Sequence, residues 1–121
     1  MAYEESVKAI TLLAGADFST TGRNRFGKIG TDGKIELAGA GERAAGVIGD
    51  NVAEDRRCAL QIDGVIMVEA GGTVTAGDIA ASGSNGTVVT QASTAVVMGV
   101  ILESGTSGVL VPVLFQPQGA P

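Results

Sequence analysis

The sequence predicts an all-β protein: a small, compact β-sandwich or barrel-like domain of two related β-modules, with little or no helix. Three observations predict this fold class. Apolar and polar residues alternate in short runs, which recur at close to the roughly 8–12 residues typical of a sandwich or barrel. Asp-Gly and Asn-Gly pairs, which favour tight hairpin turns, separate several of the runs. The 19 glycines among 121 residues leave few stretches able to form a long helix.

The expected strands lie within a single domain of residues 7–115. The first strand begins at Val7, and the segment before it, Met1–Ser6, has no apolar pattern and is expected to be a flexible arm. The later runs are Arg25–Ile29, Lys34–Leu37, Ala45–Ile48, Cys58–Ile62, Val65–Val68, Thr73–Thr75, Ile79–Ala81, Thr87–Thr90, Val96–Leu102 and Val109–Phe115. The one helical candidate is Asn51–Arg57, which is long enough for a single turn. The tail, residues 116–121, contains prolines, which lack the N–H needed to extend a β-ladder.

Two Asp-Gly pairs predict hairpins. Asp32-Gly33 lies between the runs Arg25–Ile29 and Lys34–Leu37, and Asp63-Gly64 lies between the fifth and sixth strand runs. A type I′ turn needs positive φ at both central residues, and Asp-Gly tolerates this conformation better than most pairs. We therefore expect each pair to reverse the chain between two antiparallel strands.

An internal repeat relates residues 26–48 to residues 79–101. The motif Gly46-Val47-Ile48 recurs 53 residues later as Gly99-Val100-Ile101, and Asp32-Gly33 recurs at the same offset as Asn85-Gly86. Over this ungapped window five residues are identical, where the composition would give roughly two by chance. The sequence therefore predicts two related β-modules that share one core.

Composition and charge exclude several classes of function. The chain has 13 acidic and 8 basic residues and no histidine, so it lacks both the clustered cations that bind nucleic acid and the commonest general base. Its single cysteine allows no internal disulfide and no cysteine-based metal site. The N-terminus does not resemble a signal peptide, and no apolar run approaches the roughly 18 residues that span a bilayer. We expect a non-enzymatic protein without cofactor or metal, made in a reducing cytoplasm.

The few residues that suggest chemistry have structural interpretations. Asp78 follows a glycine in a turn and is expected to cap nearby backbone amides, because no partner base is recognisable near it. Cys58 lies within a strand run and is expected to be a reduced core or half-buried thiol, because only the neighbouring arginines are available to lower its pKa. No catalytic, cofactor-binding or metal-ligating residue is therefore predicted.

Four residues are candidates for contacts with a partner protein or another subunit. Tyr3, the only tyrosine, combines apolar area with a hydroxyl near the chain end, and Val7 begins a strand suited to pairing with a partner's edge. Arg23 and Arg25 form the local positive cluster of an otherwise acidic chain and are candidates to meet an acidic protein surface. A solvated loop is the alternative interpretation of this cluster.

The order of the glycine-rich motifs resembles that of the small capsid cement, or head decoration, proteins of tailed bacteriophages. The motifs are Leu13-Ala14-Gly15-Ala16-Asp17-Phe18-Ser19, Gly30-Thr31-Asp32-Gly33-Lys34-Ile35, Ala45-Gly46-Val47-Ile48, Asp63-Gly64-Val65, Ala70-Gly71-Gly72-Thr73-Val74-Thr75-Ala76-Gly77-Asp78 and Gly99-Val100-Ile101-Leu102-Glu103-Ser104-Gly105. The resemblance implies a homotrimer on the outer surface of the virion capsid, made in the host bacterial cytoplasm. It also implies that the partner is the major capsid protein, that the expanded shell is stabilised, and that there is no enzyme activity and no cofactor. The composition and the apolar runs, as described above, argue separately against a nucleic-acid or membrane partner.

Two alternatives remain open at this point. The chain is also compatible with a lipoyl- or biotinyl-like barrel-sandwich carrier, since Lys34 follows a hairpin turn, although the usual neighbours of a carrier lysine are missing. A third possibility, which nothing in the sequence excludes, is another virion part, such as a tail or fibre domain.

Overall fold

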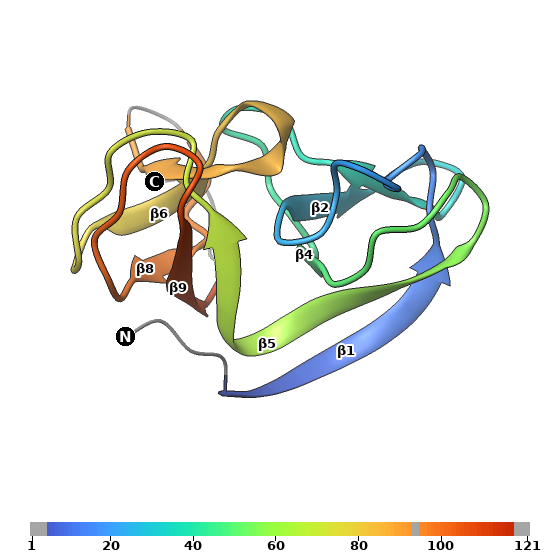
Figure 1. Ribbon diagram of the computed structural model, residues 1–121, viewed down its shortest axis with the longest axis horizontal. Coiled ribbons are helices and arrows are strands. Elements are labelled where there is room, and N and C mark those ends of the chain that lie inside the picture. The colour runs from blue at the N-terminus through green and yellow to red at the C-terminus, as the bar shows by residue number, and fades with distance from the viewer. Residues whose placement is uncertain (1–4, 93–94, 118–121) are drawn as a thin grey trace.

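A computed structural model describes residues 5–92 and 95–117, and over these residues the protein is all-β (Figure 1). The predicted fold class is confirmed. The strands are β1 Glu5–Leu13, β2 Phe26–Ile29, β3 Ile35–Leu37, β4 Gly46–Ile48, β5 Arg57–Glu69, β6 Ile79–Ser82, β7 Val88–Thr90, β8 Gly99–Ile101 and β9 Leu110–Phe115. In this part of the chain the only helical element is a short 3-10 turn, η1, at Ser84–Gly86.

All nine strands belong to one antiparallel sheet. The order of hydrogen-bonded neighbours is β3-β2-β4-β5-β9-β8-β6-β7, and β1 pairs with β5 from outside this path. Figure 1 shows β5 running along the lower edge of the molecule beside β1 and then turning upward toward β9. The remaining short strands form two groups, β2–β4 on one side and β6–β9 on the other.

The two groups repeat each other strand by strand. Three strands of the first group begin 53 residues before their counterparts: β2 and β6 at 26 and 79, β3 and β7 at 35 and 88, β4 and β8 at 46 and 99. The pairing register repeats as well, since Val47 lies opposite Gln61 and, 53 residues on, Val100 lies opposite Leu114. We name residues 5–62 module 1 and residues 63–115 module 2.

The first strand of each module is also equivalent, at an offset of 56. Ala9 lies opposite Gln61 in the β1–β5 pair, and Val65 lies opposite Leu114 in the β5–β9 pair. The second half of β5 is therefore the counterpart of β1, while its first half is the counterpart of β9. The continuous strand β5 is therefore both the last strand of module 1 and the first strand of module 2.

This continuity makes the predicted Asp63-Gly64 hairpin wrong. Both residues lie inside β5, whose first half pairs with β1 and β4 and whose second half, from Gly64 onward, pairs with β9. Of the two, only Gly64 has a positive φ, 101°, so the pair does not form a type I′ turn. Asp63 instead lies opposite Lys8 in the β1–β5 ladder, and Gly64 allows β5 to change direction between the modules.

Other local expectations need correction. Only Gly33 of the Asp32-Gly33 pair has positive φ, whereas both Asn85 and Gly86 do, at the equivalent turn of module 2. Within the helical candidate Asn51–Arg57, residues 51–56 form an irregular loop with a turn, and Arg57 is the first residue of β5. The strand expected to begin at Val7 begins at Glu5, so Glu5 and the next residue belong to β1 rather than to the predicted arm.

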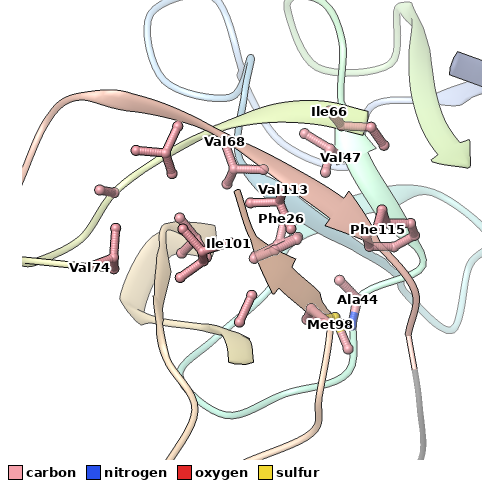
Figure 2. Packing of buried hydrophobic residues seen from close by; sticks show 14 of the residues in the cluster. Phe26, Ala44, Val47, Ile66, Val68, Val74, Met98, Ile101, Val113 and Phe115 are labelled. Carbon is pink, nitrogen blue, oxygen red and sulfur yellow. Dashed lines mark hydrogen bonds between the residues drawn. The ribbon is translucent and has the colours of Figure 1, made fainter. Parts of the chain in front are cut away.

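Two clusters of buried side chains make up the core. The smaller one belongs to module 1 and consists of Ala14, Phe18, Ile35, Ile48, Cys58 and Leu60. The larger one fills module 2 and also takes in residues of module 1, namely Phe26, Ala38, Ala44 and Val47. In Figure 2, Phe26 lies between the two modules near Val113 and Phe115, and its ring centroid is 6.2 Å from that of Phe115. The modules are therefore joined by an apolar interface as well as by β5.

Candidate interaction surfaces

The basic loop before β2 has two arginines with different surroundings. Arg23 is exposed, and its backbone N–H donates to Oδ1 of Asn51 at 3.1 Å. Arg25 is largely buried, and its guanidinium forms an ion pair with Glu69 at 3.1 Å and donates to the carbonyl of Asn85 at 3.0 Å. Arg23 is thus free to face a partner with its side chain, while Arg25 ties module 1 to module 2.

The loop backbone reinforces this link between the modules. Asn24 adopts a left-handed φ of 65°, its N–H donates to the carbonyl of Ile48, and its own carbonyl accepts from the N–H of Glu69. Gly22 packs so closely on Phe18 that a Cβ would lie 2.5 Å from the Phe18 Cβ. The loop that carries Arg23 is therefore fixed to the fold at both ends, which presents this cation in a defined place.

The other two predicted contact residues lie at the N-terminal end. Val7 lies in β1, within the irregular stretch of its pairing with β5 between Glu5 and Lys8. Tyr3 lies outside the described residues. Of the predicted contact residues that the structure describes, Arg23 and Arg25 lie in the loop before β2, and Val7 lies in β1.

An open groove lies where β1 ends beside the turn that precedes β3. Its volume is about 480 Å³, and it is lined by Thr11, Leu12, Leu13, Asp32, Gly33, Lys34 and Arg57. The Lys34 ammonium is bound to the carboxylate of Asp55 at 2.6 Å, and this hydrogen bond raises the pKa of Lys34. This ion pair links the turn before β3 to the loop before β5.

The structural interpretations of Asp78 and Cys58 are confirmed. The Asp78 carboxylate accepts from the backbone N–H of Thr75 at 3.1 Å and from the hydroxyl of Thr90 at 2.9 Å, so it caps its own turn. Cys58 is fully buried in the core of module 1, and burial raises the pKa of its thiol. Neither side chain is set up as a reactive group.

The described part of the chain shows neither a metal-binding cluster nor a membrane helix. Within residues 5–92 and 95–117, no group of three or more Cys, Asp or Glu side chains is arranged to hold a metal ion. Over the same residues, no helix is both long and apolar enough to cross a membrane.

Exposed apolar side chains form a surface feature that sequence reasoning missed. Ile10, Ile29 and Ile79 are each more than two-fifths exposed, although all three lie in strands. The first two belong to module 1 and the third to module 2. Their repeat-equivalent positions are buried, so the local sequence carries no signal that separates the exposed positions from the buried ones.

Comparison with known proteins supports the fold. No protein-family model and no curated protein sequence matches the chain. Among solved structures, a similar chain is described as the head fiber gp8.5 N base in bacteriophage phi29. It superposes with a TM-score of 0.75 over 92% of this chain and 95% of that one, at 21% sequence identity. This is a likeness of fold, and it extends over nearly the whole of both chains.

Proposed function

We propose that the protein is a non-enzymatic structural component of a bacteriophage virion that sits on the outer surface of the capsid. The observation that carries this proposal is the fold, which is similar over almost its full length to the N base of a phage head fiber. The order of the glycine-rich motifs, which resembles that of capsid cement proteins, independently supports the same location on the outer surface of the capsid.

The specific role that we propose is decoration of the expanded head. A homotrimer binds where capsomers meet and bridges neighbouring copies of the major capsid protein. Each contact with the shell is weak by itself. Once one subunit of the trimer is bound, the other two are held close to their own sites at a high effective concentration, so the trimer as a whole attaches tightly. Because the protein binds the assembled shell and not its separated subunits, binding stabilises the shell by mass action.

The exposed Arg23 is the proposed point of contact with acidic groups on the shell. The chain carries 13 acidic and 8 basic residues, so most of its surface would repel an acidic partner. Arg23 is an exposed cation on a loop whose backbone is held by Ile48, Glu69 and Asn51. A cation fixed in this way contributes to binding with little loss of backbone freedom.

A second candidate function is the base of a head fibre, favoured because the similar structure is itself a head fiber N base. In that role the protein also attaches to the head, but it anchors a longer appendage instead of reinforcing the shell. The two roles differ in what they do to the capsid, and this difference can be measured.

The test uses heads of the phage that encodes the chain, purified from a strain in which its gene is deleted. Purified protein is added back, and the particles are examined by electron cryomicroscopy and by thermal disruption of the shell. Decoration predicts trimeric density outside the shell and a higher disruption temperature. A fibre base predicts density on the head with an unchanged disruption temperature. Density confined to the tail, or no bound protein, would contradict both.

A further inference from the structure

The contact between the modules is formed by two different surfaces. Module 1 contributes Phe26, Ala44 and Val47, and module 2 contributes residues that include Ile66, Ser82, Met98 and Phe115. Figure 2 shows Val47 beside Ile66, and it shows the N–H of Ala44 donating to the Met98 sulfur, at 3.4 Å. The N–H of Gly41 donates to the carbonyl of Ser82 at 2.8 Å. Because the two surfaces differ, the contact is head-to-tail, and its repetition between copies gives a closed ring, such as a trimer, when the rotation closes, and an open chain when it does not.

Module 2 has the same outer surface that module 1 uses for this contact. At an offset of 53, Phe26, Ala44 and Val47 correspond to Ile79, Val97 and Val100. The first three are buried, whereas Ile79 is 48% exposed and the two valines are half-buried. We name Ile79, Val97 and Val100 the trailing face. It is apolar and, among the described residues, no third module covers it.

Module 1 has the complementary surface. Ile66 corresponds to Ile10 at the offset of 56, and Ser82, Met98 and Phe115 correspond to Ile29, Ala45 and Ile62 at the offset of 53. Ile10 and Ile29 are 42% and 43% exposed, and Ala45 is also exposed. We name Ile10, Ile29, Ala45 and Ile62 the leading face. All four side chains are apolar, including that of Ile29, whose equivalent in module 2 is Ser82.

We propose that the trailing face of one chain binds the leading face of a second copy of the same chain, reproducing between chains the contact that joins the modules within one. The occupant is a second copy because only a module of this kind presents the surface that the trailing face is built to meet. This inference names the surfaces for the self-association in the proposed function. It is tested without capsids, so that its failure is distinguishable from failure of that function.

The end of β9 fits this arrangement. The strand ends at Phe115, and Pro117 occupies the position equivalent to Gly64, at which β5 continues into module 2. Proline has no N–H for the ladder, so β9 does not continue as β5 does. In the proposed contact, β1 of the next copy takes the place of the missing continuation, because β1 is the counterpart of the second half of β5.

The contact between chains is expected to be weaker than the one within a chain. The Arg25–Glu69 ion pair has no counterpart, because Asp78 and Leu13 occupy the equivalent positions. The phenylalanine pair is replaced by Ile79 and Ile62, which bury less area. The contact is therefore mainly apolar. We expect the fraction of associated chains to rise with protein concentration, and the dissociation constant to change only slightly with salt.

The first test compares variants by sedimentation velocity at high micromolar concentration. We expect the unmodified chain to form oligomers, and Ile79→Asp or Ile10→Asp each to weaken association at least tenfold. Leu110→Asp is the matched control, since Leu110 is 41% exposed but belongs to neither face. Circular dichroism checks that each variant is folded. A wild-type chain that stays at 12.0 kDa, or a control that dissociates equally, would overturn the proposal.

The second test establishes that the contact is head-to-tail. Mixing Ile79→Asp with Ile10→Asp leaves one intact face of each kind, so the mixture is expected to give a dimer that grows no further. For a covalent readout, Ala45→Cys and Val97→Cys chains are mixed in a Cys58→Ser background. These positions correspond to Met98 and Ala44, and we expect disulfide-linked heterodimers in excess over either homodimer. Monomers from the first mixture, or a statistical distribution of crosslinks, would contradict the proposal.

Discussion

At the scale of single residues, neighbours in the sequence have separate roles because of what surrounds them. Arg23 and Arg25 are two positions apart, yet the first is exposed and the second is mostly buried against Glu69 and Asn85. A buried guanidinium must be paired, since removing its partner leaves an uncompensated charge. Arg25 is therefore important for joining the modules, while the side chain of Arg23 is exposed.

Substitution of Arg25 is expected to lower the stability of the fold, whereas substitution of Arg23 is expected to weaken binding to the capsid. Arg25→Ala is expected to lower the free energy of unfolding by about 1–3 kcal/mol, because it removes a charged hydrogen bond and leaves Glu69 half-buried and unpaired. Arg23→Ala is expected to change stability by less than about 0.5 kcal/mol and to weaken capsid binding. Urea unfolding and capsid pull-down measure the two effects. Equal stability of both variants would contradict the assigned role of Arg25.

The thiol of Cys58 is expected to be unreactive in the folded protein. Burial raises its pKa and also blocks approach of a reagent, so little thiolate is available at about pH 8. A chromogenic disulfide reagent should label the native protein slowly, and should label one thiol per chain rapidly in guanidinium chloride. Rapid labelling without denaturant would show that the module 1 core opens readily.

At the scale of elements, the repeated Gly-Val-Ile motif follows from close packing of neighbouring strands. A Cβ on Gly46, at the start of β4, would lie 2.4 Å from the Gln61 carbonyl oxygen of β5. A Cβ on Gly99, at the start of β8, would lie 2.0 Å from the carbonyl oxygen of Leu114 in β9. The two acceptors are themselves 53 positions apart, so the same steric constraint requires glycine in both modules.

Alanine substitution tests this constraint. Gly99→Ala and Gly46→Ala are each expected to destabilise the protein by at least about 1–3 kcal/mol, because strand backbone must shift to avoid the new methyl group. Gly72→Ala is the control, since nothing lies within 4 Å of the place its Cβ would occupy and its φ is not positive. Thermal unfolding compares the three variants. A control that is destabilised as much as Gly99→Ala would refute the steric explanation.

At the scale of the whole molecule, β1 is anchored by its pairing with β5. From Ala9 to Leu13 the strand follows β5 in continuous register, and its inner face adds Leu12 to the core of module 1. We therefore expect this pairing to hold the strand in place in a chain that lacks residues 1–4. The proposed contact of Tyr3 with a partner can be tested by removing them.

Deleting residues 1–4 is expected to leave the thermal midpoint of the free protein nearly unchanged. If Tyr3 is an anchor on the capsid, the truncated chain should bind undecorated expanded heads at least tenfold more weakly, which is about 1.4 kcal/mol per subunit. A Tyr3→Phe variant isolates the contribution of the hydroxyl. Equal binding by truncated and full-length protein would reject the arm and favour the loop that carries Arg23.

The sequence by itself determined the fold class, the repeat and the absence of reactive motifs in this protein. These are local or compositional properties: alternation of apolar residues, a Gly-Val-Ile motif found twice, no histidine and one cysteine. They could be predicted because strand propensity and turn chemistry act over a few residues. The same local signals also suggested the contact role of Arg23, which the structure leaves exposed.

Only the tertiary structure decided how the two modules are joined. Asp63-Gly64 has the local signature of a hairpin, yet β5 is continuous there because its halves pair with strands far away in the sequence. Phe26 and Ile79 occupy equivalent positions in similar local sequence, but the first is buried by module 2 and the second is exposed. Burial of an apolar side chain depends on what lies opposite it, and what lies opposite Phe26 is a different module.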